Sequence, residues 1–229
     1  MKPPIPSNEA ARLEALRRYR VMDTPKEQAY DDITQLAAFI CGTPIALMTL
    51  VDTERQWFKS KQGLAGTQTP RDQAFCAHTI FQSRLLVVED ATQDERFATN
   101  PLVTADPHIR FYAGTPLLTP DGFGLGSLCV IDRQPRKLSS EQASALESLG
   151  RMVIRQLELR RASADLASAA ENIKILSGLL PICSYCKGIR NDQGFYQRVE
   201  TYLAKHSDVT FTHGICPECI KKHFPGLDG

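Results

Sequence analysis

The sequence predicts an α+β domain, then a long helix, then a small cysteine-rich module at the C-terminus. Helical and strand periodicities alternate through roughly the first 130 residues, which is typical of sheet and helices in one domain. No proline occurs between Ser139 and Leu176, and four of the seven cysteines fall in the last 47 residues. We therefore expect three parts, with boundaries at 1–136, 137–179 and 180–229.

Composition favours a soluble globular protein. Of 229 residues, 42% are hydrophobic and 23% are charged, which excludes disordered and fibrous chains. The net charge of +1 supplies no overall field for nucleic acid or an anionic membrane. Without a signal peptide or an apolar span, we expect a cytoplasmic protein with reduced cysteines, too short for a sensor joined to a full kinase or cyclase.

Two helices and two strands are expected first. Apolar residues recur three and four positions apart over 9–16 and again from Pro25 to Gly42, which predicts two helices. The continuous apolar run 45–51 predicts a buried central strand. Residues 55–60 predict its antiparallel partner, because the intervening turn is too short for a parallel crossover.

The rest of the domain is expected to complete the sheet. Residues 71–81 predict a helix and 85–90 a strand, whereas 91–108 has little periodicity and is interpreted as a segment that covers a site. Segments 109–118 and 126–132 flank a Pro-Asp-Gly turn and predict a hairpin. Together these elements predict a mostly antiparallel sheet flanked by helices.

The proline-free stretch predicts one helix of about 60 Å at 1.5 Å per residue. Apolar stripes favour a two-stranded parallel coiled coil and hence a homodimer, although Arg160 and Arg161 interrupt the seam. A helix lying on its own domain and a monomeric spacer are the alternatives. The stripes comprise Leu146, Leu149, Val153 and Leu157, then Leu166, Ala170, Ile173 and Leu176.

Several motifs are spread over the first 135 residues, among them 23–25 (DTP), 55–60 (RQWFKS), 69–72 (TPRD), 74–78 (AFCAH) and 125–132 (LGSLCVID). On these motifs the segment resembles a GAF domain of the kind found in bacterial sensor proteins. The resemblance implies a central antiparallel sheet with helices on one side and a small-molecule pocket on the other. Such domains bind ligands as different as cyclic nucleotides, tetrapyrroles and amino acids, so an effector is expected without being identified.

Eight residues are candidates for lining that pocket. Lys59 and Arg110 could clamp an anion, while Trp57 and Tyr112 offer flat faces and polar donors. The alternative is a scaffold role, with Trp57 packed and Arg110 paired to an aspartate. The candidates are Trp57, Lys59, Phe75, Cys76, His78, Phe97, Arg110 and Tyr112.

Two chemical interpretations of the domain's cysteines are disfavoured. Attachment of bilin or haem at Cys76 and His78 conflicts with their spacing, which separates the two side chains by about 200° on a helix. Reduction of free methionine sulfoxide would need converging cysteines, and we expect Cys41, Cys76 and Cys129 to lie apart, without an acidic cluster. The sequence therefore predicts no catalytic residues.

The C-terminal cysteines form two CxxC pairs separated by 29 residues, Cys183 with Cys186 and Cys216 with Cys219. Two such turns can complete a tetrahedral site, and a module this small needs a staple, so structural Zn²⁺ is expected. His213 is a rival ligand, and a redox-active dithiol or an iron–sulfur centre are alternatives. Together with 180–183 (LPIC) and 187–190 (KGIR), the pairs resemble a cysteine-rich module found at the end of bacterial sensor and response-regulator proteins.

These features predict a non-enzymatic signalling protein, in which effector binding is relayed through a dimeric helix to a zinc module that contacts a partner protein. The alternative is a thiol-based redox sensor whose paired cysteines oxidise and release zinc. Nucleic-acid binding is disfavoured, because from Leu180 onward six basic residues face five acidic ones. No kinase, cyclase, phosphodiesterase or P-loop signature was found. The basic candidates were Lys187, Arg190, Lys205, Lys221 and Lys222.

Overall fold

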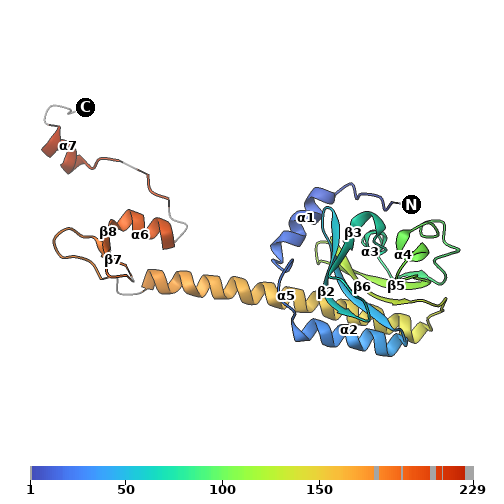
Figure 1. The fold of residues 1–229 in the computed structure, drawn as a ribbon. Coiled ribbons are helices and arrows are strands. Elements are labelled where there is room, and N and C mark those ends of the chain that lie inside the picture. Colours follow the sequence, from blue (N-terminus) through green and yellow to red (C-terminus); the bar gives the residue numbers. More distant parts are fainter. Residues whose placement is uncertain (1, 178–180, 192, 207–209, 213, 225–229) are drawn as a thin grey trace. The chain divides into compact units, whose positions relative to one another are not determined.

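The computed structural model of the protein describes residues 2–177, 181–191, 193–206, 210–212 and 214–224. The chain divides into two compact units, Met1–Ser163 and Ala164–Gly229, which are described separately (Figure 1). The first unit contains a sheet with helices packed against it. Its boundary lies beyond the expected one at 136, because the beginning of the long helix packs into the same core.

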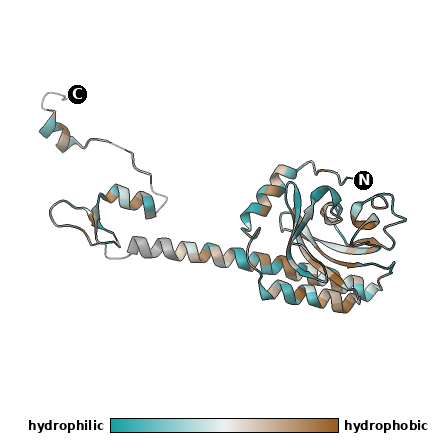
Figure 2. Ribbon diagram, viewed as in Figure 1, coloured by the Kyte–Doolittle hydropathy of each residue, from teal (hydrophilic) through white to brown (hydrophobic). Residues whose placement is uncertain are grey.

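The sheet of the first unit is antiparallel throughout, which confirms the expected α+β architecture. Its six strands follow the order β3-β2-β1-β6-β5-β4 (Figure 1). Every residue of the two central strands is buried, and Figure 2 shows hydrophobic residues concentrated along the middle of the sheet. The strands are β1 (Ile45–Val51), β2 (Arg55–Gln62), β3 (Gln68–Pro70), β4 (Leu86–Val88), β5 (Phe111–Leu118) and β6 (Gly124–Asp132).

Three helices contribute to the apolar core on one face of the sheet: α1 (Glu9–Arg18), α2 (Gln28–Cys41) and the first half of α5 (Ser140–Ser177). Helix α5 confirms the expected long helix. Its inward stripe of leucines and valine is buried in this core, and Gly150 permits close packing, since a Cβ there would lie 2.5 Å from the Thr115 side chain. The beginning of α5 therefore belongs to the domain core.

The other face of the sheet is covered by short elements and loops. These are the 3₁₀ turn η1 (Arg71–Gln73), α3 (Cys76–Thr79) and α4 (Pro101–Thr104). The single helix expected over 71–81 is wrong, because Ala74 has an extended backbone that separates η1 from α3. The expected irregular segment contains α4, whose Asn100 side chain accepts a bond from Leu102 N and donates one to the Gln73 carbonyl, each at 2.9 Å.

The second unit contains the remainder of α5, a hairpin of β7 (Ile189–Arg190) and β8 (Tyr196–Gln197), α6 (Val199–His206) and α7 (Pro217–His223). The helix expected from Phe195 begins later because Tyr196 and Gln197 pair with β7. Most of its described apolar side chains are exposed, Tyr185 to 97%, and Ile189 is the buried exception among them. None of the helices in the described parts of the chain has the length and apolar character needed to cross a membrane.

Candidate functional site

A cavity of 220 Å³ lies between the sheet and its cover of short elements and loops. Side chains from β1, β2, β5 and β6 form its floor, and α3 and the loops around Leu64 and Pro107 enclose it. The lining is mostly apolar, as in small-molecule sites. It includes Leu47, Gln56, Phe58, Leu64, Thr69, Phe75, Cys76, Leu102, Asp106, Ile109, Tyr112, Ile131 and Arg133.

Two lining residues carry buried polar atoms without a hydrogen-bond partner in the structure, Gln56 Oε1 and Thr69 Oγ1. The two residues are directly opposite each other on β2 and β3. An unpaired buried polar atom is costly, and native structures keep few of them. The cavity therefore presents two adjacent polar atoms whose hydrogen-bonding capacity is unused.

The aromatic candidates form a stack at the cavity wall. The rings of Phe75 and Phe97 are parallel with centroids 4.0 Å apart, and Phe75 also contacts the ring of Tyr112 at 5.2 Å. His78 packs edge-on against Phe97 at 4.8 Å. Of these four, Phe75 and Tyr112 line the cavity, while Phe97 and His78 lie behind Phe75. Of the eight predicted residues, three line the cavity: Phe75, Cys76 and Tyr112.

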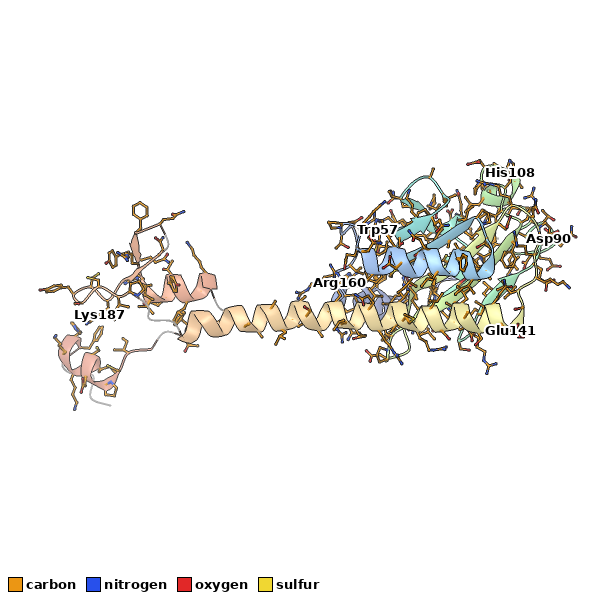
Figure 3. The ribbon with its side chains drawn as sticks, turned by 90° about the horizontal axis from the view of Figure 1, so that it is seen from below. Trp57, Asp90, His108, Glu141, Arg160 and Lys187 are labelled. Atoms are coloured by element: carbon orange, nitrogen blue, oxygen red, sulfur yellow. The ribbon has the colours of Figure 1, made fainter. Side chains whose placement is uncertain are left out.

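Trp57 and Lys59 lie on the opposite face of the sheet, which corrects the expectation that they line the pocket. Trp57 belongs to the core beneath the helices, and Figure 3 shows it well away from His108, whose neighbour Pro107 lines the cavity. Lys59 Nζ donates to Thr24 Oγ1, the Pro25 carbonyl and Glu27 Oε1 at 2.6–2.8 Å. Lys59 therefore ties β2 to the start of α2 and does not contribute to the cavity, whose cationic lining residue is Arg133.

Arg110 is also not among the cavity-lining residues. Its Nη1 donates to the carbonyls of Val103 and Ile109, at 2.9 and 3.1 Å, so it braces the covering loop. Gln56, Phe58 and Thr69 were missed by sequence reasoning. Because side chains alternate along a strand, Gln56 and Phe58 lie on one face of β2, and Trp57 and Lys59 lie on the other. This alternation was the signal in the sequence that could have identified Gln56 and Phe58.

Cys76 and Cys129 lie together at the back of the cavity, which contradicts the expectation that the domain's cysteines stay apart. Their Sγ atoms are 3.7 Å apart, whereas Cys41 belongs to the core on the other face. The Tyr112 hydroxyl donates to Cys76 Sγ at 3.5 Å and is 2.6 Å from Thr79 Oγ1. A Cβ at Gly114 would overlap this hydroxyl at 2.1 Å, so the glycine makes room for it.

The two thiols have opposite acidities. Burial by itself raises the pKa of Cys76, but hydrogen bonds with Cys129, Ser127, Thr49 and Tyr112 lower it to about 7. The pKa of Cys129 is raised, first by burial and then by its hydrogen bond with Cys76. Of the pair, Cys76 is the thiol that ionises first.

The C-terminal cysteines form two local pairs. Backbone N–H groups of Cys186 and Tyr185 lower the pKa of Cys183, and that of Cys219, at 3.5 Å, lowers the pKa of Cys216. Within the described ranges, no three potential metal ligands come together. The structure therefore places the cysteines in pairs without uniting them, and the rival ligand His213 lies outside the described residues.

An open groove of 590 Å³ also lies between β5 and α5. Arg84, Arg151 and Arg155 line it together with Glu147. None of its lining residues carries a buried polar atom that lacks a partner. The cavity on the other face of the sheet is therefore the stronger candidate.

Comparisons with known proteins match the chain to one family and one signalling enzyme. The model of the GAF domain family matches residues 25–157. A cyclic di-GMP phosphodiesterase of Pseudomonas aeruginosa is 40% identical over 162 residues, which are 70% of this chain and 28% of that protein. The chain thus spans little more than a quarter of the enzyme's length.

Solved structures are similar to the chain at low sequence identity. The chromophore-binding domain of an unusual bacteriophytochrome from R. palustris aligns with a TM-score of 0.50 and 11% identity, covering 68% of this chain and 61% of that one. The GAF domain of an Acinetobacter phosphoenolpyruvate-protein phosphotransferase aligns with a TM-score of 0.49 and 18% identity, covering 70% and 96%.

The prediction of a non-enzymatic signalling protein is wrong on these comparisons, because the relative at 40% identity is named as a phosphodiesterase. The comparison links the chain to a signalling enzyme by sequence similarity. The same comparison also argues against the expectation, based on the lack of catalytic signatures in the sequence, that the protein is not an enzyme. Since the family model matches more than half of the sequence and the antiparallel sheet carries the corresponding fold, the chain belongs to the GAF domain family.

Proposed function

We propose that this chain is the effector-sensing part of an enzymatic signalling system that hydrolyses cyclic di-GMP. The cavity beneath α3 is the effector site. The observation that carries the proposal is the pair of unpartnered polar atoms, Gln56 Oε1 and Thr69 Oγ1, in a cavity that is mostly apolar and is also lined by Asp106 and Arg133. The similarity to a phosphodiesterase supports the link to hydrolysis.

The cavity also limits what the effector can be. At 220 Å³ it falls below the range of about 300–1,000 Å³ that is usual for drug-sized ligands. Cyclic di-GMP, with two nucleosides and two phosphates, is too large for it, so the effector and the substrate are different molecules. The two adjacent polar atoms, with Asp106 and Arg133 in a mostly apolar lining, favour a small molecule that combines apolar surface with N–H or O–H donors.

The test is a chimera in which residues 1–163 of this chain replace the matching part of the Pseudomonas enzyme. Small hydrogen-bond donors that shift the melting temperature of the full chain are added, and hydrolysis is followed by chromatography of the product. We expect the rate to change at least threefold with a ligand, and Gln56→Met to abolish the response but not the basal rate. A ligand-independent rate in the unsubstituted chimera would contradict the proposal.

For the C-terminal unit we propose a structural zinc ion bound by Cys183, Cys186, Cys216 and Cys219. Each pair already directs backbone N–H groups at sulfur, an arrangement that stabilises thiolate ligands. The exposed apolar side chains of this unit supply little core of their own, so a metal would provide folding free energy. Zinc closed in by four thiolates would have no catalytic position.

We further propose that the protein is a cytoplasmic homodimer. Exposed apolar side chains support the dimer: Phe39 on α2 is 84% exposed, and Met152 and Leu159 are exposed on α5. The last two are seven residues apart, the spacing of a coiled-coil seam. This stripe is distinct from the buried leucines of the same helix, so α5 can contact its own core and a second copy together.

A further inference from the structure

We propose that Cys76 and Cys129 are a redox pair that a small hydroperoxide entering the cavity converts to a disulfide. The inference concerns the two buried cysteines on the cavity face of the sheet, not the CxxC pairs of the C-terminal unit. It does not rest on the link to cyclic di-GMP. It requires the cavity, a nucleophilic thiol at its wall and a second thiol within reach.

The two sulfur atoms are close enough that a local movement of the backbone would allow them to form a disulfide. Cys76 is the first residue of α3, and Cys129 lies on β6. Their Sγ atoms, 3.7 Å apart, must approach to about 2.05 Å. Helix α3 has only four residues, whereas β6 is paired on both sides with β1 and β5. The short helix is therefore the element that moves.

The cavity decides which cysteine reacts first. Cys76 is among the lining residues, while Cys129 is fully buried behind it. A reagent in the cavity thus meets Cys76 Sγ, and Cys129 can attack only a sulfur that has already been oxidised. Cys76 is the attacking thiol and Cys129 the resolving one.

Hydroxyl groups around the pair assist the chemistry. The Tyr112 hydroxyl lies 3.5 Å from Cys76 Sγ and 3.4 Å from Ser127 Oγ, and Thr79 Oγ1 is 2.6 Å from the same hydroxyl. This network stabilises a thiolate at Cys76, in line with the lowered pKa of that thiol. Thiolates, not thiols, are the nucleophiles in such reactions.

Two steps complete the reaction. The Cys76 thiolate attacks the hydroperoxide, an S–O bond forms as the O–O bond breaks, and the departing alkoxide takes a proton from water to become an alcohol. Cys129 sulfur then attacks Cys76 sulfur, the S–O bond breaks, and hydroxide leaves with the Cys129 proton as water. The peroxide is reduced by two electrons while the two thiols are oxidised to one disulfide.

Closure of the disulfide would also alter the effector site. Phe75, next to Cys76, and Tyr112, bonded to it, both line the cavity. A shift of α3 toward β6 displaces this wall. Oxidation would therefore change the binding of any ligand held there, and the chain would report peroxide and effector at one place.

The experiment treats the reduced full chain with hydrogen peroxide and maps its cysteines by mass spectrometry after blocking free thiols. We expect a linked pair of peptides containing Cys76 and Cys129, reversed by dithiothreitol. Cys41 is the matched internal control, since burial raises the pKa of its thiol to about 11 and it should stay reduced. In Cys129→Ser, the Cys76 sulfenic acid should persist and be labelled by dimedone.

Two results would overturn the proposal. One is that Cys76 and Cys129 stay reduced in the wild-type chain at peroxide concentrations that oxidise the exposed C-terminal cysteines. The other is that Cys76 is linked to a cysteine other than Cys129. The wild-type map needs no variant, so misfolding of Cys129→Ser cannot mask either result. Ligand binding by the reduced chain tests the effector proposal separately.

Discussion

Gln56 and Lys59 are three positions apart on β2, and their side chains lie on opposite faces of the sheet. Gln56 leaves an unpaired oxygen at the cavity, whereas Lys59 is fully paired among Thr24, Pro25 and Glu27. Burial of the lysine is compatible with folding because each proton of its ammonium has an acceptor. Lys59, which was expected to bind an anion, thus connects β2 to α2, and the neutral amide of Gln56 faces the cavity.

We expect Gln56→Met and Thr69→Val each to raise the free energy of unfolding of the ligand-free chain by about 1 kcal/mol, because each removes an unpartnered polar atom. Urea denaturation followed by circular dichroism measures the change. Thr49→Val is the matched control on β1, since it removes a hydroxyl bonded to the Ser127 carbonyl at 3.3 Å and should lower stability by a similar amount.

The same variants should lose affinity for any ligand found by thermal shift. Stability gained together with affinity lost is the signature of a binding site that trades stability for function. If Gln56→Met and Thr69→Val destabilise as much as Thr49→Val, their polar atoms are not free in solution, and the argument for the effector site fails.

At the scale of elements, the first cysteine turn is formed by hydrogen bonds between neighbouring residues, whereas the face that each β2 side chain occupies depends on distant segments. Cys183 N donates to the Gly188 carbonyl at 2.9 Å, Lys187 N donates to the Cys183 carbonyl at 3.0 Å, and Lys187 has a left-handed φ of 59°. These contacts close a tight turn from six consecutive residues. Such a motif is readable from spacing alone, whereas the joining of two turns at one ion is not.

Protein purified without chelator should contain about one zinc per chain, because four thiolates complete one tetrahedral site. Cys183→Ser should lower that content, and Cys41→Ser, the control in the other unit, should leave it unchanged. Elemental analysis by mass spectrometry provides the measurement. His213→Ala separates the ligand sets: zinc retained supports four thiolates, and zinc lost supports three thiolates with one imidazole.

Chelation should affect the two units differently. Because the second unit has little apolar core in its described part, EDTA should make it sensitive to proteolysis while residues 1–163 stay resistant. A zinc content well below one per chain, or a C-terminal unit that resists protease equally with and without EDTA, would argue against the metal.

For the whole molecule, the exposed apolar stripe on α5, Met152 and Leu159, and the exposed Phe39 of α2 should set the oligomeric state. Leu159→Glu and Phe39→Glu should each convert a dimer to a 25.5 kDa monomer at micromolar concentration, since each buries a charge in the proposed interface. Light scattering after size exclusion measures the mass. Ile5→Glu, an exposed apolar position outside both helices, should leave the dimer intact.

A wild-type chain that is monomeric under these conditions would remove the dimer from the proposal. So would a dimer that survives both substitutions on α2 and α5. Neither result would affect the cavity, because Phe39 and Leu159 are not among its lining residues.

Much of the fold was predictable because its determinants are local. The apolar run over β1, the Pro-Asp-Gly turn before β6 and the proline-free course of α5 are patterns of neighbouring residues, and each produced the expected element. The break at Ala74 and the short helix α4 were missed. Both depend on contacts with distant segments, such as the bond from Asn100 to Gln73.

By itself the sequence determined the fold class, the long helix and the two CxxC turns, since periodicity and spacing act over a few residues. Only the tertiary structure decided which face of β2 meets the cavity and that Cys76 lies beside Cys129, 53 residues away in the chain. The face that a side chain occupies and the residues that it contacts depend on how the strands pair and on which segments cover the sheet. Both depend on interactions throughout the core. The cavity and its two thiols therefore became visible only in the folded chain.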